Sequence, residues 1–320
     1  SDHDLLPTHN FQYGTHREAV NLSQSVYRPI FDPGFDGCWM GCTVACSHGV
    51  RDFVPLTGPY KGRKVFVDGP EYETIAGCGS NLGIFDPHTV IEMNFYCDAY
   101  GLDTISLGGT IAAFFELYSL AKDRKEKRTP GEEAFLKDVG PFCELHGEPQ
   151  FGRKEILLPI VHAIGRSEGI GRILAQGSYR FCQKYGHPEL SMSVKRMELP
   201  AYDPRTAYLQ GLCYEMNNRG GCHLENGYTA IRDYCAGYAE WPGDRIEGTA
   251  VVELDDVLKL GRTGPDTRRA DGTAPAACRS AARVPVVRDA IAVVVEAIVT
   301  YLRRPGIHGS PGIIAISTVG

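Results

Sequence analysis

Three equally spaced cysteines are the feature that most restricts how this chain can fold. Cys38, Cys42 and Cys46 lie four residues apart in a glycine-flanked, otherwise apolar segment. Thiolates in such an array are soft ligands that suit an iron–sulfur cluster, whereas a zinc site would still need a fourth ligand. The same spacing also places the three side chains on one face of a helix, where they could simply pack into a core.

A straight helix would not serve as a cluster site. Its rise separates Cys38 from Cys46 by roughly 12 Å, which is too far for two ligands of one cluster. Cluster binding therefore requires a bend in the chain, and Gly37 and Gly41 permit one. Taken alone, the spacing leaves the cluster and the packed core equally open.

Composition limits the classes of function. The chain has 320 residues, of which 43% are hydrophobic, so it can bury a large core and favours two domains. Its net charge of −6 argues against nucleic acid or an anionic membrane as a partner. The longest apolar run, from Ala290 to Leu302, is short and interrupted by Glu296. We therefore expect a cytoplasmic protein that does not enter a membrane.

The eleven cysteines are not expected to form a disulfide framework. Their number is odd, they are scattered along the chain, and no signal peptide is apparent. Thiols that stay reduced are available to bind metal. Only the triplet has a spacing that suggests metal binding.

The periodicity of apolar residues predicts a mainly α fold with few short strands. A helix is expected over 87–100, because Asp86 can act as its N-cap, Pro87 suits the first helical position and Gly101 ends the pattern. Further helices are predicted over 109–121, after Thr129, over 156–164 and over 173–185, with a strand over 65–67. Loops are predicted over 68–74 and 122–128.

A polar stretch between Gly186 and Pro200 predicts a domain boundary near residue 190. We expect a helical domain over 1–190 that carries the cysteine triplet, and a second helical domain over 191–320. After about residue 258 the composition becomes atypical, with no lysine beyond Lys259. We interpret this last region as a truncated or frame-shifted reading.

Two glutamates and one histidine are candidates for proton transfer. Glu71 and Glu73 follow a Gly-Pro pair, and a partly buried carboxylate there could move protons, although most such glutamates are only solvated. His223 ends a glycine-rich corner. It could be an acid, a base or a ligand, but a lone histidine is more often a hydrogen-bonded structural residue.

Two pairs of polar residues have simple structural explanations. His88 and Glu92 stand one helical turn apart, which suits a metal but also an ordinary surface pair. Asp98 and Asp103 flank Gly101, where capping and turn formation are the default explanation. The glycine-rich stretches lack the spacing of a nucleotide-binding loop.

Several stretches occur together in a fixed order. They are Leu6 to Thr8 with Asn10 and Phe11, the cysteine triplet, Gly69 to Thr74, Asp98 to Ser106, Leu174 to Gly177, Tyr202 to Arg205, and Asn218 to His223. In these stretches the chain resembles the aldehyde ferredoxin oxidoreductase family of tungsten or molybdenum bis-pterin enzymes. The resemblance covers roughly residues 5 to 250.

The resemblance implies roles for three groups of residues. It implies that Cys38, Cys42 and Cys46 are ligands of a [4Fe–4S] cluster. It implies that Glu73 and His223 are acid/base residues near the tungsten. It implies a pterin contact at the D-x-x-G-L-D stretch, with Asp98, Gly101, Leu102 and Asp103 as the matching positions.

The activity implied by the resemblance is the oxidation of an aldehyde to a carboxylic acid, with electrons passing through the cluster to ferredoxin or another electron-transfer subunit. One alternative is the catalytic subunit of a class II benzoyl-CoA reductase, which acts on an aromatic acyl-CoA. The alternative from another class is an inactive fragment or scaffold. The sequence leaves a homo-oligomer open.

The chain departs from the family pattern at the cluster. The commoner spacing is C-x2-C-x3-C, and here the first gap has one more residue. The family's fourth cysteine lies in a D-x-x-G-[LI]-C stretch that we do not find, and Cys278 has no such context. The family's N-terminal pterin-covering domain is also not recognisable. The family's interface metal uses a Glu-x-x-His order, which His88 and Glu92 reverse, so that site is not assigned.

Overall fold

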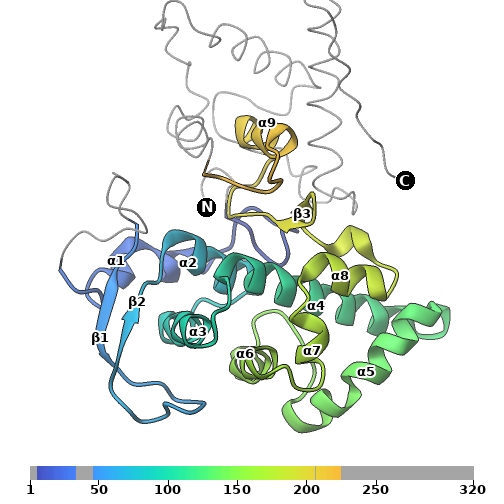
Figure 1. The fold of residues 1–320 in the computed structure, drawn as a ribbon, viewed down its shortest axis with the longest axis horizontal. Helices are drawn as coiled ribbons and strands as arrows, with labels where there is room; N and C mark the ends of the chain where they lie inside the picture. The colour runs from blue at the N-terminus through green and yellow to red at the C-terminus, as the bar shows by residue number, and fades with distance from the viewer. Residues whose placement is uncertain (1–5, 34–45, 206, 225–320) are drawn as a thin grey trace, which may run out of the picture.

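The computed structural model describes residues 6–33, 46–205 and 207–224. Within them the fold is mainly α with few short strands, so the predicted fold class is confirmed. Figure 1 shows the β1–β2 hairpin at one end of this part, α5 at the other and α4 between them. Cys38, Cys42 and the atypical region after residue 258 lie outside the described residues.

The elements follow one another in a long series of helices with two small hairpins. The helices are α1 (Gln24–Tyr27), α2 (Tyr72–Cys78), α3 (Pro87–Tyr100), α4 (Thr104–Arg124), α5 (Pro130–His146), α6 (Leu157–Arg166), α7 (Gly171–Leu174), α8 (Ser178–Lys184) and α9 (Tyr208–Met216). The strands are β1 (Gly49–Phe53), β2 (Val65–Asp68), β3 (Ser193–Val194) and β4 (Met197–Glu198). Short 3₁₀ turns are η1 (Ala19–Leu22), η2 (Ser80–Leu82), η3 (Lys125–Lys127), η4 (Lys154–Ile156) and η5 (Pro188–Leu190).

Helix α3 has the predicted ends. It starts at Pro87 behind Asp86, and it ends at Tyr100, where Gly101 takes a left-handed conformation with φ of 69°. Glycine adopts this conformation without the steric penalty of a Cβ atom. The α3 boundaries were therefore readable from local signals alone.

Helix α4 is the buried centre of the fold. It starts earlier than predicted because Asp103 acts as its N-cap, with Oδ1 accepting the Ser106 N–H at 2.7 Å. The stretch Thr104–Lys127 is long and apolar enough to cross a membrane, but 72% of its most apolar window is buried inside the described part of the chain. This burial is what a central core helix requires.

Helices α2 and α4 touch through backbone at two glycines. A Cβ atom on Gly108 would lie 2.6 Å from the carbonyl oxygen of Gly77, which is closer than any side chain can come. The contact matters for the site because α2 carries Glu73 and α4 begins directly after Asp103.

Helix α5 opens with the predicted signal. Thr129 and Glu132 form a capping box, in which each side chain accepts a hydrogen bond from the other residue's backbone N–H. Glu132 is fully buried, and its Oε1 lies 2.8 Å from Arg124 Nη1 and 3.0 Å from His187 Nε2. The predicted loop over 122–128 is wrong in part, because α4 continues to Arg124 and η3 follows it.

The remaining helical prediction needs one correction. The expected helix over 173–185 is two helices, α7 and α8, because Gly177 has φ of 86° and interrupts the hydrogen-bonding pattern. The helix expected over 156–164 is present as α6, Leu157–Arg166.

Strands are few among the described residues. The predicted strand over 65–67 is present as β2 and pairs antiparallel with β1, with Val50 opposite Val67. The pairing shifts between Val50 and Phe53. Strand β1 was not predicted, and β3 pairs with β4 in a minimal hairpin.

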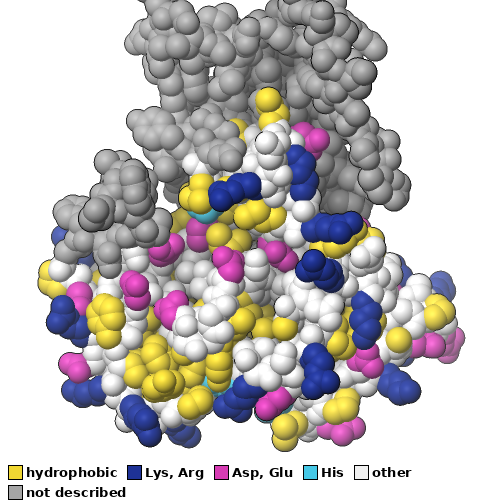
Figure 2. All heavy atoms as spheres, viewed as in Figure 1, with side chains coloured by type: hydrophobic (Ala, Val, Ile, Leu, Met, Phe, Trp, Pro, Cys, Tyr) yellow, Lys and Arg dark blue, Asp and Glu magenta, His cyan; other side chains and the backbone are white. Residues whose placement is uncertain are grey.

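The buried apolar residues form two clusters. The larger one runs from Leu22 to Leu190. The smaller one joins Phe11 to Met192, Val194, Leu199 and Tyr214. The predicted domain limits stay a prediction, since most of the expected second domain lies outside the described residues. On the face in Figure 2, the described Lys and Arg side chains are interspersed with Asp and Glu.

Candidate functional site

Glu73 lies in the first turn of α2, so its predicted place in a loop over 68–74 is wrong. Proline has no N–H to donate to a strand ladder, and Pro70 follows strand β2 closely. Glu71 keeps an extended backbone with φ −77° and ψ 168°, and the helix begins at Tyr72. The connecting loop is therefore only three residues long, 69–71.

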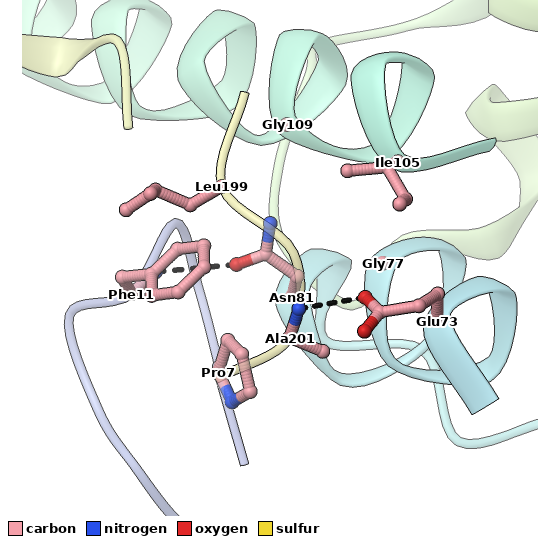
Figure 3. Close-up of a pocket in the computed structure, with 9 residues that line it drawn as sticks. All are labelled: Pro7, Phe11, Glu73, Gly77, Asn81, Ile105, Gly109, Leu199 and Ala201. Atoms are coloured by element: carbon pink, nitrogen blue, oxygen red, sulfur yellow. Dashed lines mark hydrogen bonds between the residues drawn. The ribbon is translucent and has the colours of Figure 1, made fainter. Parts of the chain in front are cut away.

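The Glu73 carboxyl group is buried and bound on one side. The residue is 7% exposed, and its Oε2 accepts the backbone N–H of Ala201 at 2.7 Å. Its Oε1 has no hydrogen-bond partner. The neighbouring Tyr72 donates its hydroxyl to the Ala201 carbonyl at 2.9 Å. Two consecutive residues of α2 thus bind both backbone groups of Ala201, and Figure 3 shows the bond made by Glu73.

The environment of Glu73 favours its protonated form. Burial is the largest of the effects that together raise the pKa of Glu73 to about 8; the carboxylates of Glu71 and Asp103 also raise it, and the Ala201 N–H lowers it. At neutral pH the Glu73 carboxyl group is therefore protonated in most molecules. A carboxyl group in this range can donate a proton near neutrality.

A small pocket lies against Glu73. It is lined by Pro7, Phe11, Glu73, Gly77, Asn81, Ile105, Gly109, Leu199 and Ala201, and Figure 3 shows these residues. Glu73 is the only ionisable side chain among them. The walls otherwise consist of apolar groups and one amide, so they keep the carboxyl group away from bulk water.

His223 lies in the turn after α9, close to Tyr202. The two ring centroids are 5.8 Å apart. Burial lowers the pKa of His223, and the carboxylate of Asp103 opposes this. The ring is therefore mostly neutral at neutral pH and can accept a proton.

Tyr202 links the predicted site residues, and sequence reasoning assigned it no role. Burial raises the pKa of its phenol most, and the charges of Glu73 and Cys46 raise it as well. Its ring also lies 5.8 Å from the ring of Tyr72. The structure thus brings Glu73, His223 and Cys46 around one tyrosine. The sequence signal that could have pointed to Tyr202 is its position in a turn between two prolines.

The D-x-x-G-L-D stretch joins α3 to α4 at an exposed surface. Asp103 caps α4 as predicted, and the capping hydrogen bond from the Ser106 N–H goes to its Oδ1. Asp98 accepts the Asn94 amide at 3.0 Å through Oδ2, and partial burial with the carboxylates of Asp68 and Glu71 raises its pKa to about 6. Nothing lies within 4 Å of a Cβ atom built on Gly101.

This surface fits the pterin implied by the resemblance. Asp98 and Asp103 are exposed and each keeps a carboxylate oxygen for the N–H donors of such a ring. Leu102 donates its backbone N–H to the Cys97 carbonyl at 2.8 Å, so the loop backbone is already fixed.

Of the cysteine triplet, only Cys46 belongs to the described residues, where it is partly buried. Cys38 and Cys42 fall in the segment 34–45 that the structure does not describe. Across residues 6–33, 46–205 and 207–224, no three His, Cys, Asp or Glu side chains are grouped so as to hold a metal ion. The predicted cluster ligands stay a prediction.

His88 and Glu92 form a structural pair. Their Nδ1 and Oε2 atoms are 3.8 Å apart. Glu92 is 2% exposed, and its Oε1 accepts the backbone N–H groups of Leu56 and Thr57 and the Thr57 hydroxyl. The carboxylate therefore anchors the β1–β2 loop to α3.

Comparisons with known proteins agree on one family. The family model described as "Aldehyde ferredoxin oxidoreductase, domains 2 & 3" matches residues 1–270. A tungsten-containing aldehyde ferredoxin oxidoreductase of Pyrococcus furiosus is 48% identical over 159 residues, which are 50% of this chain and 24% of the relative. The corresponding protein of Thermococcus kodakarensis is 42% identical over 226 residues, 71% of this chain and 33% of the relative.

A more distant relative has another name. The WOR-like subunit of an aliphatic sulfonate oxidoreductase from Pyrococcus furiosus is 29% identical over 185 residues, 55% of this chain and 27% of the relative. The chain thus spans about a quarter to a third of the length of the curated relatives it matches.

Proposed function

The chain belongs to the aldehyde ferredoxin oxidoreductase family, and from this premise we propose that it is part of a tungsten-dependent enzyme that oxidises an aldehyde to a carboxylic acid. The balanced half-reaction is RCHO + H2O → RCOOH + 2 H⁺ + 2 e⁻. When bound, the tungsten–pterin group supplies the two-electron acceptor, and a [4Fe–4S] cluster supplies the one-electron route to ferredoxin or another electron-transfer subunit.

The observation that carries the proposal is the placement of two groups: buried Glu73 lines the pocket with its Oε1 unbonded, and the His223 ring lies 5.8 Å from the ring of Tyr202. Glu73 is mostly protonated at neutral pH, whereas His223 is mostly neutral. When the surroundings raise the pKa of a carboxyl group and lower the pKa of a histidine, the carboxyl group can serve as the acid and the histidine as the base. Glu73 donates a proton to the aldehyde oxygen, and His223 accepts one from the attacking water.

The cofactor contacts are proposed on the same basis. Asp98, Gly101, Leu102 and Asp103 hold the pterin, since two exposed carboxylates flank an open turn there. Cys38, Cys42 and Cys46 hold the cluster. The charge of Cys46 acts on Tyr202, which supports a cluster close to the proton-transfer pair.

The experiment compares Glu73→Gln and His223→Asn in the full-length protein, with benzaldehyde as substrate and ferredoxin as acceptor. We expect kcat to fall by roughly 10²- to 10⁴-fold in each variant, with unchanged tungsten and iron content. Glu133→Gln is the matched control, because Glu133 is exposed on α5. Wild-type kcat in a fully loaded Glu73→Gln protein would refute the acid role. Turnover of benzoyl-CoA but not benzaldehyde would refute the substrate class.

A further inference from the structure

The Glu73 carboxyl group depends on one backbone donor. Among the described residues, the Ala201 N–H is its only hydrogen-bond donor, at 2.7 Å. Ala201 belongs to an irregular segment, residues 199–205, which we call the strap. The strap has no helix or strand of its own to fix the Ala201 N–H, so other contacts must hold it.

The far end of the strap contains an ion pair. Asp203 is 1% exposed, and its carboxylate accepts the Arg205 backbone N–H at 2.9 Å and the Arg205 Nη2 at 2.6 Å. Arg205 Nε lies 3.0 and 3.1 Å from the two Asp203 oxygens. The planar guanidinium therefore uses several donors on one carboxylate, which a lysine could not reproduce.

Arg205 also reaches a second part of the chain. Its Nη2 donates to the Phe11 carbonyl at 2.6 Å. The Phe11 N–H donates in turn to Asn81 Oδ1 at 3.2 Å, and the Asn10 N–H donates to the Asn81 carbonyl at 3.1 Å. Asn81 lies in η2, which follows α2 after one residue.

These contacts close a ring around the pocket. The ring runs from Glu73 to Ala201, along the strap to Arg205, across to Phe11 and through Asn81 back to α2. Figure 3 shows four of these residues, Phe11, Asn81, Glu73 and Ala201, around the pocket. Arg205 is the link that joins the strap to the segment of Phe11.

We propose that Arg205 and Asp203 are positioning residues that hold the strap so that the Ala201 N–H binds the Glu73 carboxyl group. The functional meaning of this proposal rests on the proposed acid role of Glu73. Neither residue lines the pocket beside Glu73, so both act through Ala201.

The direction of the effect follows from the hydrogen bond. The Ala201 N–H lowers the pKa of Glu73 because it stabilises the ionised carboxylate. Without it, Glu73 should hold its proton to higher pH. The other titratable groups that act on Glu73 or respond to it are Glu71, Asp103, Tyr202 and Tyr214, and none of them changes in the variants below.

The test uses two variants of the full-length protein. Arg205→Lys keeps the charge but loses the forked contact to Asp203 and Phe11. The double variant Asp203→Asn with Arg205→Gln removes both charges, so no buried carboxylate is left unpaired if the single variant folds poorly. Arg51→Met is the matched control, because Arg51 pairs with Asp32 at an exposed site away from the strap.

The titration of Glu73 is followed by infrared difference spectroscopy. The carboxyl band of Glu73 is the one that is missing from the Glu73→Gln spectrum. We expect the wild-type midpoint near pH 8 and an upward shift of about one pH unit in both strap variants. Hydrogen exchange of the Ala201 amide should become faster in the same variants. Arg51→Met should change neither reading.

The proposal would be overturned if the folded strap variants kept both the wild-type titration midpoint of Glu73 and the wild-type exchange rate of the Ala201 amide. Neither measurement requires turnover, so the strap is tested separately from the reaction. If the wild-type protein oxidised no aldehyde but the midpoint shifted as expected, the proposed function would fail and the positioning role would stand.

Discussion

Replacing Glu73 by glutamine should change how stability depends on pH. Glu73 has a pKa of about 8 in the folded chain against an ordinary value of 4.5. Between these values the folded chain keeps a proton that the unfolded chain has released. Its contribution to stability is therefore fully present below pH 4.5 and is lost as pH rises through 8. Glutamine has no proton to lose, so Glu73→Gln removes this dependence.

The magnitude follows from the two pKa values. One pH unit of difference corresponds to about 1.4 kcal/mol of unfolding free energy. Over the interval from 4.5 to about 8, wild type should lose at most about 5 kcal/mol relative to Glu73→Gln. The constant offset between the proteins depends on how the new amide is accommodated, so the slope is the quantity to compare.

The assay is urea unfolding of the cofactor-free full-length protein at intervals from pH 5 to 9, followed by far-ultraviolet circular dichroism. The difference between Glu73→Gln and wild type should grow by up to about 1.4 kcal/mol per pH unit in favour of the variant, and level off above pH 8. Glu133→Gln is the control, since an exposed carboxyl group should give a curve parallel to wild type.

Parallel curves for Glu73→Gln and wild type would refute the reasoning. They would mean that water or a nearby cation reaches the carboxyl group, so that burial does not raise its pKa. The proposed acid role would then lose its physical basis.

Three further outcomes are expected. The kcat/KM of wild type should fall as pH rises through about 8, and this limb should be absent from the residual activity of Glu73→Gln. Cys46→Ser should lower the iron content per chain, measured by mass spectrometry of metals, and leave tungsten unchanged; equal iron would contradict the ligand assignment. Arg124→Met should lower the unfolding free energy by about 2 kcal/mol, because Glu132 stays buried with one partner fewer. In the same urea assay, Arg51→Met should cost less than about 1 kcal/mol.

Local signals explain which elements were predictable. The ends of α3 and the start of α5 are set by residues within one turn, namely Pro87, Gly101, Thr129 and Glu132. The interruption at Gly177 was missed because a glycine within an apolar pattern does not by itself show whether its φ is positive.

Long-range contacts explain what sequence reasoning missed at the site. The carboxyl group of Glu73 meets an N–H that lies 128 residues away along the chain. No periodicity or spacing encodes such a contact. The candidate residues Glu73, His223, Asp98 and Asp103 were identified by resemblance, whereas the grouping of Glu73 and His223 near Tyr202 required the fold.

The glycine contact between α2 and α4 has a consequence for divergence within the family. Gly77 and Gly108 meet through backbone atoms, so the spacing of the two helices here does not depend on the size of any side chain. Related chains could exchange most core residues around these helices and still keep Glu73 at the same separation from Asp103. The walls of the pocket could then change while the proposed acid and the proposed cofactor-binding turn keep their spacing.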